Sequence, residues 1–138
     1  MENNNIEGKL KMTNLGFLSF DFKHELEVKG PMKIQFSFKV VYKILSEKAR
    51  RIKIFARAIG EDERLELNII EQAEVELVNA ELLDDNMKES ILSENSVAIM
   101  FPYLRSQIAL LTSQPGMMPI QTPIIDIREL VKNSSIEE

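Results

Sequence analysis

The chain contains no cysteine among its 138 residues. Disulfides, thiol nucleophiles, thiolate metal sites and thiol-based redox switching are therefore excluded. The sequence also lacks a continuous apolar run of about 18 residues, and its opening stretch, MENNNIEGKLKM, contains no apolar segment typical of a signal peptide. These absences fit a reducing compartment, and we expect a cytoplasmic protein that does not insert directly into a membrane.

A surplus of basic charge is missing as well. The formal net charge is -5 at pH 7 and the isoelectric point is near 5.1. A protein that binds nucleic acid needs a basic face for the phosphates. We therefore expect no nucleic-acid partner, and regard basic or apolar partners as compatible with this charge.

Residues suited to catalysis are few. The only histidine, His24, lies in phase with the apolar positions of a predicted strand, which indicates a packed structural role. The acidic stretch at 61–63 is most simply a solvated turn, because paired carboxylates need an enclosing pocket for acid and base work. Gly60 and Gly116 are isolated turn glycines and do not form a phosphate loop. We expect no catalytic residue, no metal site and no cofactor, and a protein that is not an enzyme.

The first half of the chain predicts a sheet, because apolar and polar residues alternate there with the period of a half-buried strand. Four segments show this alternation: residues 18–28, 32–44, 51–59 and 64–78. The last two predict a hairpin, in which pairing of Ala58 with Leu65 would set Arg57 opposite Glu66. With a turn at 29–31 between the first two, the pattern predicts a four-stranded antiparallel meander.

Charge is sorted between these strands. Lys29 to Arg57 contains nine Lys or Arg and one acid, whereas Glu61 to Asp85 contains ten acids and one base. One interpretation is that neighbouring strands neutralise each other. The other is an acidic docking face for a basic partner, and its candidate residues are Glu66, Glu71, Glu74 and Glu76.

The period changes to that of a helix after the fourth strand. Residues 84–94 predict a short amphipathic helix, and a long helix follows from about residue 95 to the break at 115–116. Pro102 fits the first turn of the long helix; if that helix begins earlier, we expect a kink. Arg105 is its only charge, and a helix that is apolar nearly all round must be covered on more than one side.

The end of the chain predicts an extended segment and a closing helix. Prolines at 115, 119 and 123 prevent regular helix, and Asp126 with Glu129 resembles a capping pair. We expect one α+β domain over residues 13–133, with a flexible N-terminus at 1–12 and a frayed tail at 134–138.

The order of these elements resembles the SecB export chaperones over roughly residues 13–132. The most specific part is FPY at 101–103 with Arg105 two residues later, then an uncharged helix, then G-x-x-P and P-I-x-D at 116–126. The resemblance implies a SecB-like fold and a tetramer built as a dimer of dimers. It also implies a function: holding non-native preproteins and passing them to the motor ATPase SecA. Ile69 stands at the position that matches the family's acidic SecA contact.

A tetramer would explain the uncharged long helix, because partner subunits would cover its second face. The candidate interface residues are Ile99, Ser106, Ala109 and Leu110. A groove beside the helix would bind client polypeptides, since methionine adapts to varied side chains and a strand edge supplies backbone hydrogen bonds. The candidate client-binding residues are Tyr103, Met117, Met118, Ile120 and Leu67. The alternative for the two methionines is simple packing against the sheet.

Two further functions stay open. The same fold could serve as a dedicated chaperone for the antitoxin of a toxin-antitoxin pair. Alternatively, the concave sheet and the long helix could enclose a pocket for a small apolar ligand. Binding of unrelated denatured proteins would distinguish a general holdase from both.

Overall fold

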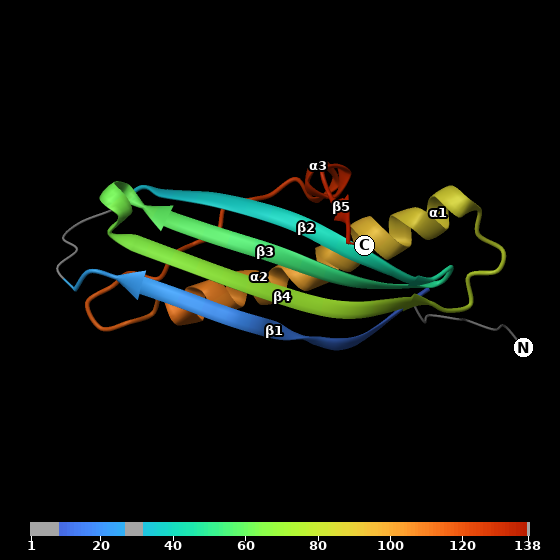
Figure 1. Ribbon diagram of the computed structural model, residues 1–138, viewed down its shortest axis with the longest axis horizontal. Coiled ribbons are helices and arrows are strands. Elements are labelled where there is room, and N and C mark those ends of the chain that lie inside the picture. The colour runs from blue at the N-terminus through green and yellow to red at the C-terminus, as the bar shows by residue number, and fades with distance from the viewer. Residues whose placement is uncertain (1–8, 27–31, 138) are drawn as a thin grey trace, which may run out of the picture.

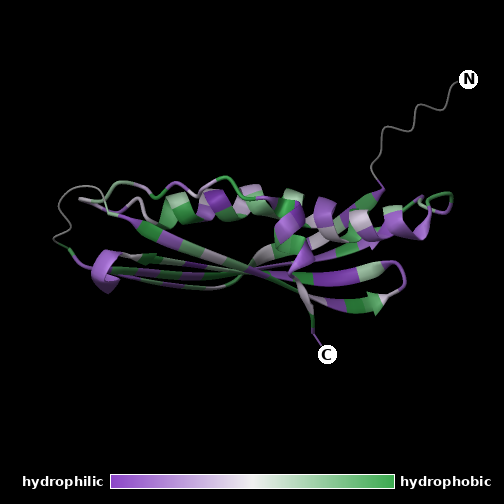
Figure 2. Cartoon of the chain, turned by 90° about the horizontal axis from the view of Figure 1, so that it is seen from above, coloured by the Kyte–Doolittle hydropathy of each residue, from purple (hydrophilic) through white to green (hydrophobic). Residues whose placement is uncertain are grey.

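The computed structural model describes residues 9–26 and 32–137, and they form a layer of strands and a layer of helices (Figure 1, Figure 2). The strands are β1 (Leu10–His24), β2 (Ile34–Ser46), β3 (Ala49–Gly60), β4 (Leu65–Leu77) and β5 (Ser135–Ile136). The helical elements are the 3-10 turn η1 (Glu61–Glu63), α1 (Asp85–Ser90), the π-turn η2 (Ile91–Asn95), α2 (Ser96–Leu111) and α3 (Ile127–Lys132). The predicted α+β class is therefore confirmed.

The sheet differs from the predicted four-stranded antiparallel meander. Its order is β1-β4-β3-β2-β5, and β5 runs parallel to β2, so the sheet has five strands and is mixed. β1 pairs with β4 and not with β2. The predicted turn at 29–31 lies outside the described residues. Alternation along a strand predicts which face each residue takes, but it does not predict which strands are neighbours.

β1 begins at Leu10, eight residues before the predicted start, and contains two irregularities. The register against β4 shifts between Thr13 and Gly16 and again between Phe17 and Ser19. Each β-bulge inserts an unpaired residue and reverses the phase of the alternation. Consequently Leu18, which the sequence assigns to the apolar face, is exposed.

The hairpin of β3 and β4 forms as expected, but its register differs by two residues. Ala58 pairs with Leu67 and not with Leu65, because η1 occupies the chain between the strands. The faces are unchanged by a shift of two. Arg57 and Glu66 therefore still meet, as a diagonal ion pair of 3.1 Å.

The two predicted helices form one continuous helical run, since η2 joins α1 directly to α2. Asp84 caps its start by accepting a hydrogen bond of 2.8 Å from the Met87 N–H. Pro102 consequently lies inside the run and not in its first turn. α2 contacts β1 and β4, and buries the apolar side chains of Val97, Met100, Phe101, Leu104 and Ile108.

The chain ends at the opposite sheet edge from β1. Asp126 caps α3 by accepting from the Glu129 N–H at 3.2 Å, as the sequence predicts. Ser135–Ile136, predicted as part of a frayed tail, pair with β2, and the Glu137 N–H donates to the Tyr42 carbonyl at 2.7 Å. Within the part of the chain that the structure describes, no helix is long and apolar enough to cross a membrane.

Candidate functional site: an apolar groove beside the edge of the sheet

An open groove of about 500 Å3 lies at the end of the molecule where β2 and β4 begin. The segment that follows α2 loops at this same end, near the turn between β3 and β4 (Figure 1). One wall consists of strand residues and the other of this segment, and both are mainly apolar. The groove is lined by Met32, Ile34, Phe36, Leu65, Gly116, Met117, Met118, Pro119, Ile120 and Gln121.

Two polar residues of the helical run fix the segment that forms the outer wall. The buried Thr112 hydroxyl accepts a hydrogen bond of 2.8 Å from the Ile120 N–H and donates to the Ile108 carbonyl, also at 2.8 Å. Arg105 donates to the Pro123 carbonyl at 3.4 Å. The only charged residue of α2 therefore ties the helix to the extended segment, which gives the FPY-x-R motif a structural role.

The inner wall borders a strand edge. β2 pairs with β3 from Ile34 to Ser46, and on its other side it pairs with β5 at Val41 and Tyr42. Among the described residues, no strand pairs with the first half of this second edge. Backbone groups on a free edge are available to an added strand.

The predicted client-binding residues do not all come together. Met117, Met118 and Ile120 line the groove; Met118 is 85% exposed, whereas Ile120 is buried. Leu67 is buried beneath the helix layer and Tyr103 lies on the exposed face of α2, so neither lines the groove.

The strand residues of the groove were missed by the sequence analysis. Ile34, Phe36 and Leu65 were correctly assigned to the apolar face of their strands, but that pattern does not distinguish a covered position from one at an open end. Met32 was the first apolar position of the predicted strand 32–44, although it precedes the observed β2. The missing information was the return path of the chain after α2.

The predicted interface residues lie on the side of α2 away from the sheet. Ile99 is 46% and Leu110 is 66% exposed, Ser106 is exposed, and Ala109 is half-buried. Tyr103 shares this face, since Ile99, Tyr103, Ser106 and Leu110 are spaced by three or four residues. The outward face of α2 is therefore apolar and open in the single chain.

Glu66 and Glu74 of the predicted acidic set are paired with bases on β3. Glu66 binds Arg57 at 3.1 Å, and Glu74 binds Arg51 at 3.3 Å. Hydrogen bonds from Asn68 and then from Arg57 hold the pKa of Glu66 below its ordinary value. These contacts support the interpretation that the oppositely charged strands neutralise each other. Glu76 remains exposed on the same face.

Glu71, the fourth member of that set, faces the interior instead. It is fully buried opposite Phe17 of β1 and Ile54 of β3, and among the described residues neither carboxylate oxygen has a hydrogen-bond partner. Burial raises the pKa of Glu71 to about 8. Glu71 therefore cannot take part in a docking face. Ile69 is likewise buried, so it cannot serve as a SecA contact.

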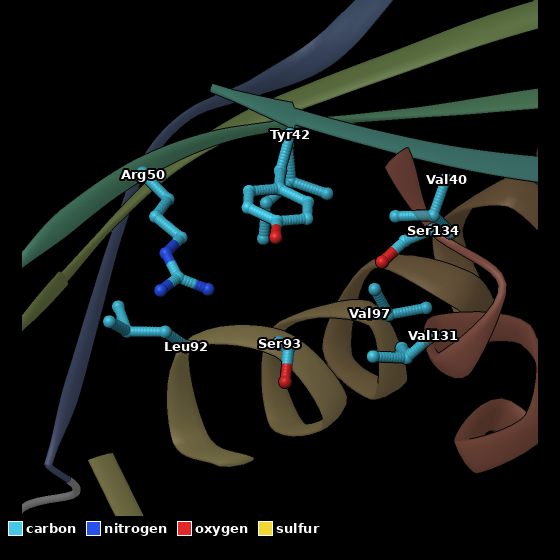
Figure 3. A pocket seen from close by; sticks show the side chains of 9 residues that line it. Val40, Tyr42, Arg50, Leu92, Ser93, Val97, Val131 and Ser134 are labelled. Atoms are coloured by element: carbon cyan, nitrogen blue, oxygen red, sulfur yellow. The ribbon is translucent and has the colours of Figure 1, made fainter. Parts of the chain in front are cut away.

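The space between the sheet and the helical run is almost filled. A cavity beside Tyr42 and Arg50 measures about 10 Å3 (Figure 3). The Arg50 guanidinium lies 5.0 Å from the centre of the Tyr42 ring and forms an ion pair with Glu89 of α1. Pockets for small molecules typically measure about 300 to 1,000 Å3. This cavity therefore gives no support to a carrier of apolar ligands.

In residues 9–26 and 32–137, no three His, Asp or Glu side chains form a group that could hold a metal ion. His24, which the sequence assigns to packing, lies 5.1 Å from Phe22 between ring centres.

No protein-family model matches the sequence, and no curated protein sequence is significantly similar to it. Several solved structures do match, and one of them confirms the resemblance to the SecB-like chaperones at the level of the fold.

One matching structure is the SecB-like chaperone Rv1957 of Mycobacterium tuberculosis, solved in complex with a ChAD peptide from the antitoxin HigA1. The two chains superpose with a TM-score of 0.68 at 12% sequence identity, over 86% of this chain and 91% of the other. A protein of unknown function from Streptococcus agalactiae gives a TM-score of 0.42 at 9% identity, over 83% of this chain and 97% of that one. The chain thus has the SecB-like fold.

Proposed function

We propose that this protein is a chaperone of the holdase type, which binds extended apolar segments of non-native polypeptides in the groove. The observation that carries the proposal is the open groove of about 500 Å3, lined by apolar side chains and bordered by a free strand edge. Methionine is flexible and polarizable, so a groove rich in it suits varied client side chains. The β2 edge would supply backbone hydrogen bonds that do not depend on client sequence.

The fold supports the same function. The chaperone with which this chain shares its fold was solved with a bound peptide. Binding of a peptide by that protein makes binding of an extended segment by this one the simplest proposal. We also propose that the protein acts as a homotetramer, because the apolar outward face of α2 would then be covered.

The range of clients distinguishes a general export chaperone from a dedicated antitoxin chaperone. Preprotein export is implied by the resemblance of the sequence, and would require contact with SecA. A dedicated antitoxin chaperone is favoured by the antitoxin peptide in the related structure. A general holdase would suppress aggregation of an unrelated denatured protein, whereas a dedicated chaperone would bind one polypeptide and leave the others unprotected.

The groove is tested by replacing Met117 and Met118 together with serine. Burial of a large apolar side chain contributes about 1.5 to 3 kcal/mol, so binding of a client that covers both should weaken at least about tenfold. Stability should change little, because Met118 is largely exposed. Affinity for a fluorescently labelled, reduced and carboxymethylated α-lactalbumin, which remains unfolded, is the measurement.

The matched control is Met87→Ser on α1, which removes a half-exposed methionine outside the groove. Its affinity should equal that of the unaltered protein. Equal affinity of the groove variant would contradict the proposed site. A large fall in its thermal midpoint would show instead that the two methionines belong to the core.

A further inference from the structure

The groove is lined by several thioethers. Three of the seven methionines of the chain, Met32, Met117 and Met118, are in its walls. The chain has no cysteine, and the other lining residues are aliphatic, aromatic or amide side chains. The thioether sulfurs are therefore the groups of the groove most easily modified by a mild two-electron oxidant.

The exposure of the methionines favours reaction in the groove over reaction in the core. Met118 is 85% exposed, and Met117 and Met32 are half-buried along the walls. Met100, on the sheet-facing side of α2, is fully buried. Since oxidation follows access to the sulfur, an oxidant should reach the groove before it reaches the core.

Met32 connects the groove directly to the end of the sheet. Its Sδ atom packs so closely on Gly60, the last residue of β3, that a methyl group on Gly60 would displace the methionine side chain. An oxygen added to this sulfur would have to be placed against the strand end or into the groove. Oxidation of Met32 would therefore change the shape of the groove as well as its polarity.

We infer that the groove methionines form an oxidation-sensitive switch for client binding, an inference that rests on the proposed function. A hydroperoxide such as hydrogen peroxide would oxidise each thioether to a sulfoxide. The sulfur lone pair attacks one peroxide oxygen, the S–O bond forms as the O–O bond breaks, and water leaves. Sulfur loses two electrons and the peroxide gains them.

The sulfoxide changes what the groove can bind. A methionine sulfoxide carries a strong hydrogen-bond acceptor in place of an apolar thioether. Burial of a polar group without a hydrogen-bond partner is unfavourable, and an apolar client segment supplies no side-chain donor. Oxidation should therefore release apolar clients, and methionine sulfoxide reductases with a thiol reductant should restore binding by removing the oxygen as water.

The experiment compares the unaltered protein with two leucine variants before and after treatment with hydrogen peroxide. M32L/M117L/M118L keeps an apolar groove of similar volume but removes its sulfurs. M87L is the matched control, because Met87 is half-exposed on α1 and lies outside the groove. The probe is labelled, reduced and carboxymethylated α-lactalbumin, and peptide mass spectrometry records which methionines carry oxygen.

Oxidation should weaken binding of the probe by the unaltered protein and by M87L at least about tenfold. The triple variant should bind the probe equally well before and after oxidation, and reductase treatment should restore binding by the unaltered protein. Unchanged affinity with sulfoxide at all three groove positions would overturn the inference, as would an equal loss in the triple variant. Oxygen on Met100, or a fall in thermal midpoint together with the affinity, would place the effect in the core and overturn it too.

The untreated and oxidised samples together distinguish failure of the switch from failure of the holdase function. If the untreated protein binds the probe and the oxidised protein binds it equally well, the switch is wrong and the holdase function stands. If the untreated protein does not bind the probe, the general holdase function is wrong and the switch falls with it.

Discussion

Glu71 directs its carboxyl group to the interior, on the face of the sheet that α2 covers. Among the described residues its two oxygens have no hydrogen-bond partner, and burial raises its pKa from 4.5 to about 8. No charged group contributes to this shift, for which burial is the cause. The carboxyl is therefore neutral in the folded protein at neutral pH, whereas it is ionised in the unfolded chain.

This difference links the stability of the fold to pH. Between pH 4.5 and about 8 the folded state holds a proton that the unfolded state has lost. The stabilisation is complete below pH 4.5 and is lost as the pH rises through about 8. At 1.36 kcal/mol for each pKa unit, the total change is on the order of 5 kcal/mol.

Replacement of Glu71 by glutamine should remove this dependence. The amide has nearly the same shape and does not ionise. The free energy of unfolding of the variant should therefore rise relative to that of the unaltered protein as the pH rises from 5 to 8.5. Urea unfolding at pH 5, 7 and 8.5 measures the difference. Glu74→Gln, the same change on the exposed face, is the control. It should leave the pH dependence of the free energy of unfolding unchanged. Parallel slopes for Glu71→Gln and the unaltered protein would refute the assignment.

The sequence contained the signal for this residue. In β4 the buried positions are the odd ones from Leu65 to Leu77, and Glu71 stands in phase with them. The prediction grouped it with Glu66, Glu74 and Glu76 on the basis of charge alone, although these three stand at even positions. Phase along the strand was the better guide, because a residue in a regular strand cannot change faces.

At the scale of elements, the four long strands and the long helix were predicted from periodicity, and most boundaries fall within a few residues. Periodicity did not predict the bulges of β1. At the first of them Asn14 adopts a positive φ of 52°, and nothing in the alternation of apolar and polar residues requires this conformation. It also did not predict η2. There the Ser96 hydroxyl donates to the Ile91 carbonyl at 3.2 Å, and the helix continues where two separate helices were expected.

The groove depends on how one end of α2 is joined to the segment that follows. The Thr112 hydroxyl accepts a hydrogen bond from the Ile120 N–H and donates one to the Ile108 carbonyl. No pattern in the sequence marks this contact, because it joins residues eight apart across an irregular turn. The path of residues 113–126 was for this reason not predictable from periodicity. The groove residues of this segment, Met117, Met118 and Ile120, were predicted from the resemblance to the SecB chaperones.

Thr112→Val should test this join. Valine has the same shape but leaves the buried Ile120 N–H without an acceptor, which costs about 1 to 3 kcal/mol. We expect a lower thermal midpoint together with weaker client binding, because the outer wall loses its anchor. Thr112→Ser retains the hydroxyl and should preserve binding better than valine does. Equal binding by the valine variant and the unaltered protein would show that the segment is held by other contacts.

At the scale of the whole molecule, α2 carries apolar side chains on both of its faces. The inner face of α2 is covered by β1 and β4, while Ile99, Tyr103 and Leu110 on the outer face are about half exposed or more. Contiguous apolar surface of this kind marks an interaction site in proteins that remain in solution. A second copy of the chain is the partner we propose for it, distinct from the client groove at the end of the sheet.

Leu110→Glu should break this assembly. A tetramer would have a mass of about 64 kDa, four times 15.9 kDa. A carboxylate placed in an apolar interface has no partner and is costly to desolvate, so the variant should dissociate. Ala109→Glu should also dissociate the tetramer. Because Ala109 is half-buried, this change should in addition disturb packing within the chain. Leu82→Glu, at a fully exposed leucine outside α2, is the control and should leave the mass unchanged. Light scattering on the three variants gives the answer: a mass near 16 kDa for the unaltered protein at every concentration would remove the tetramer from the proposal, and would leave the apolar face of α2 open for a different partner.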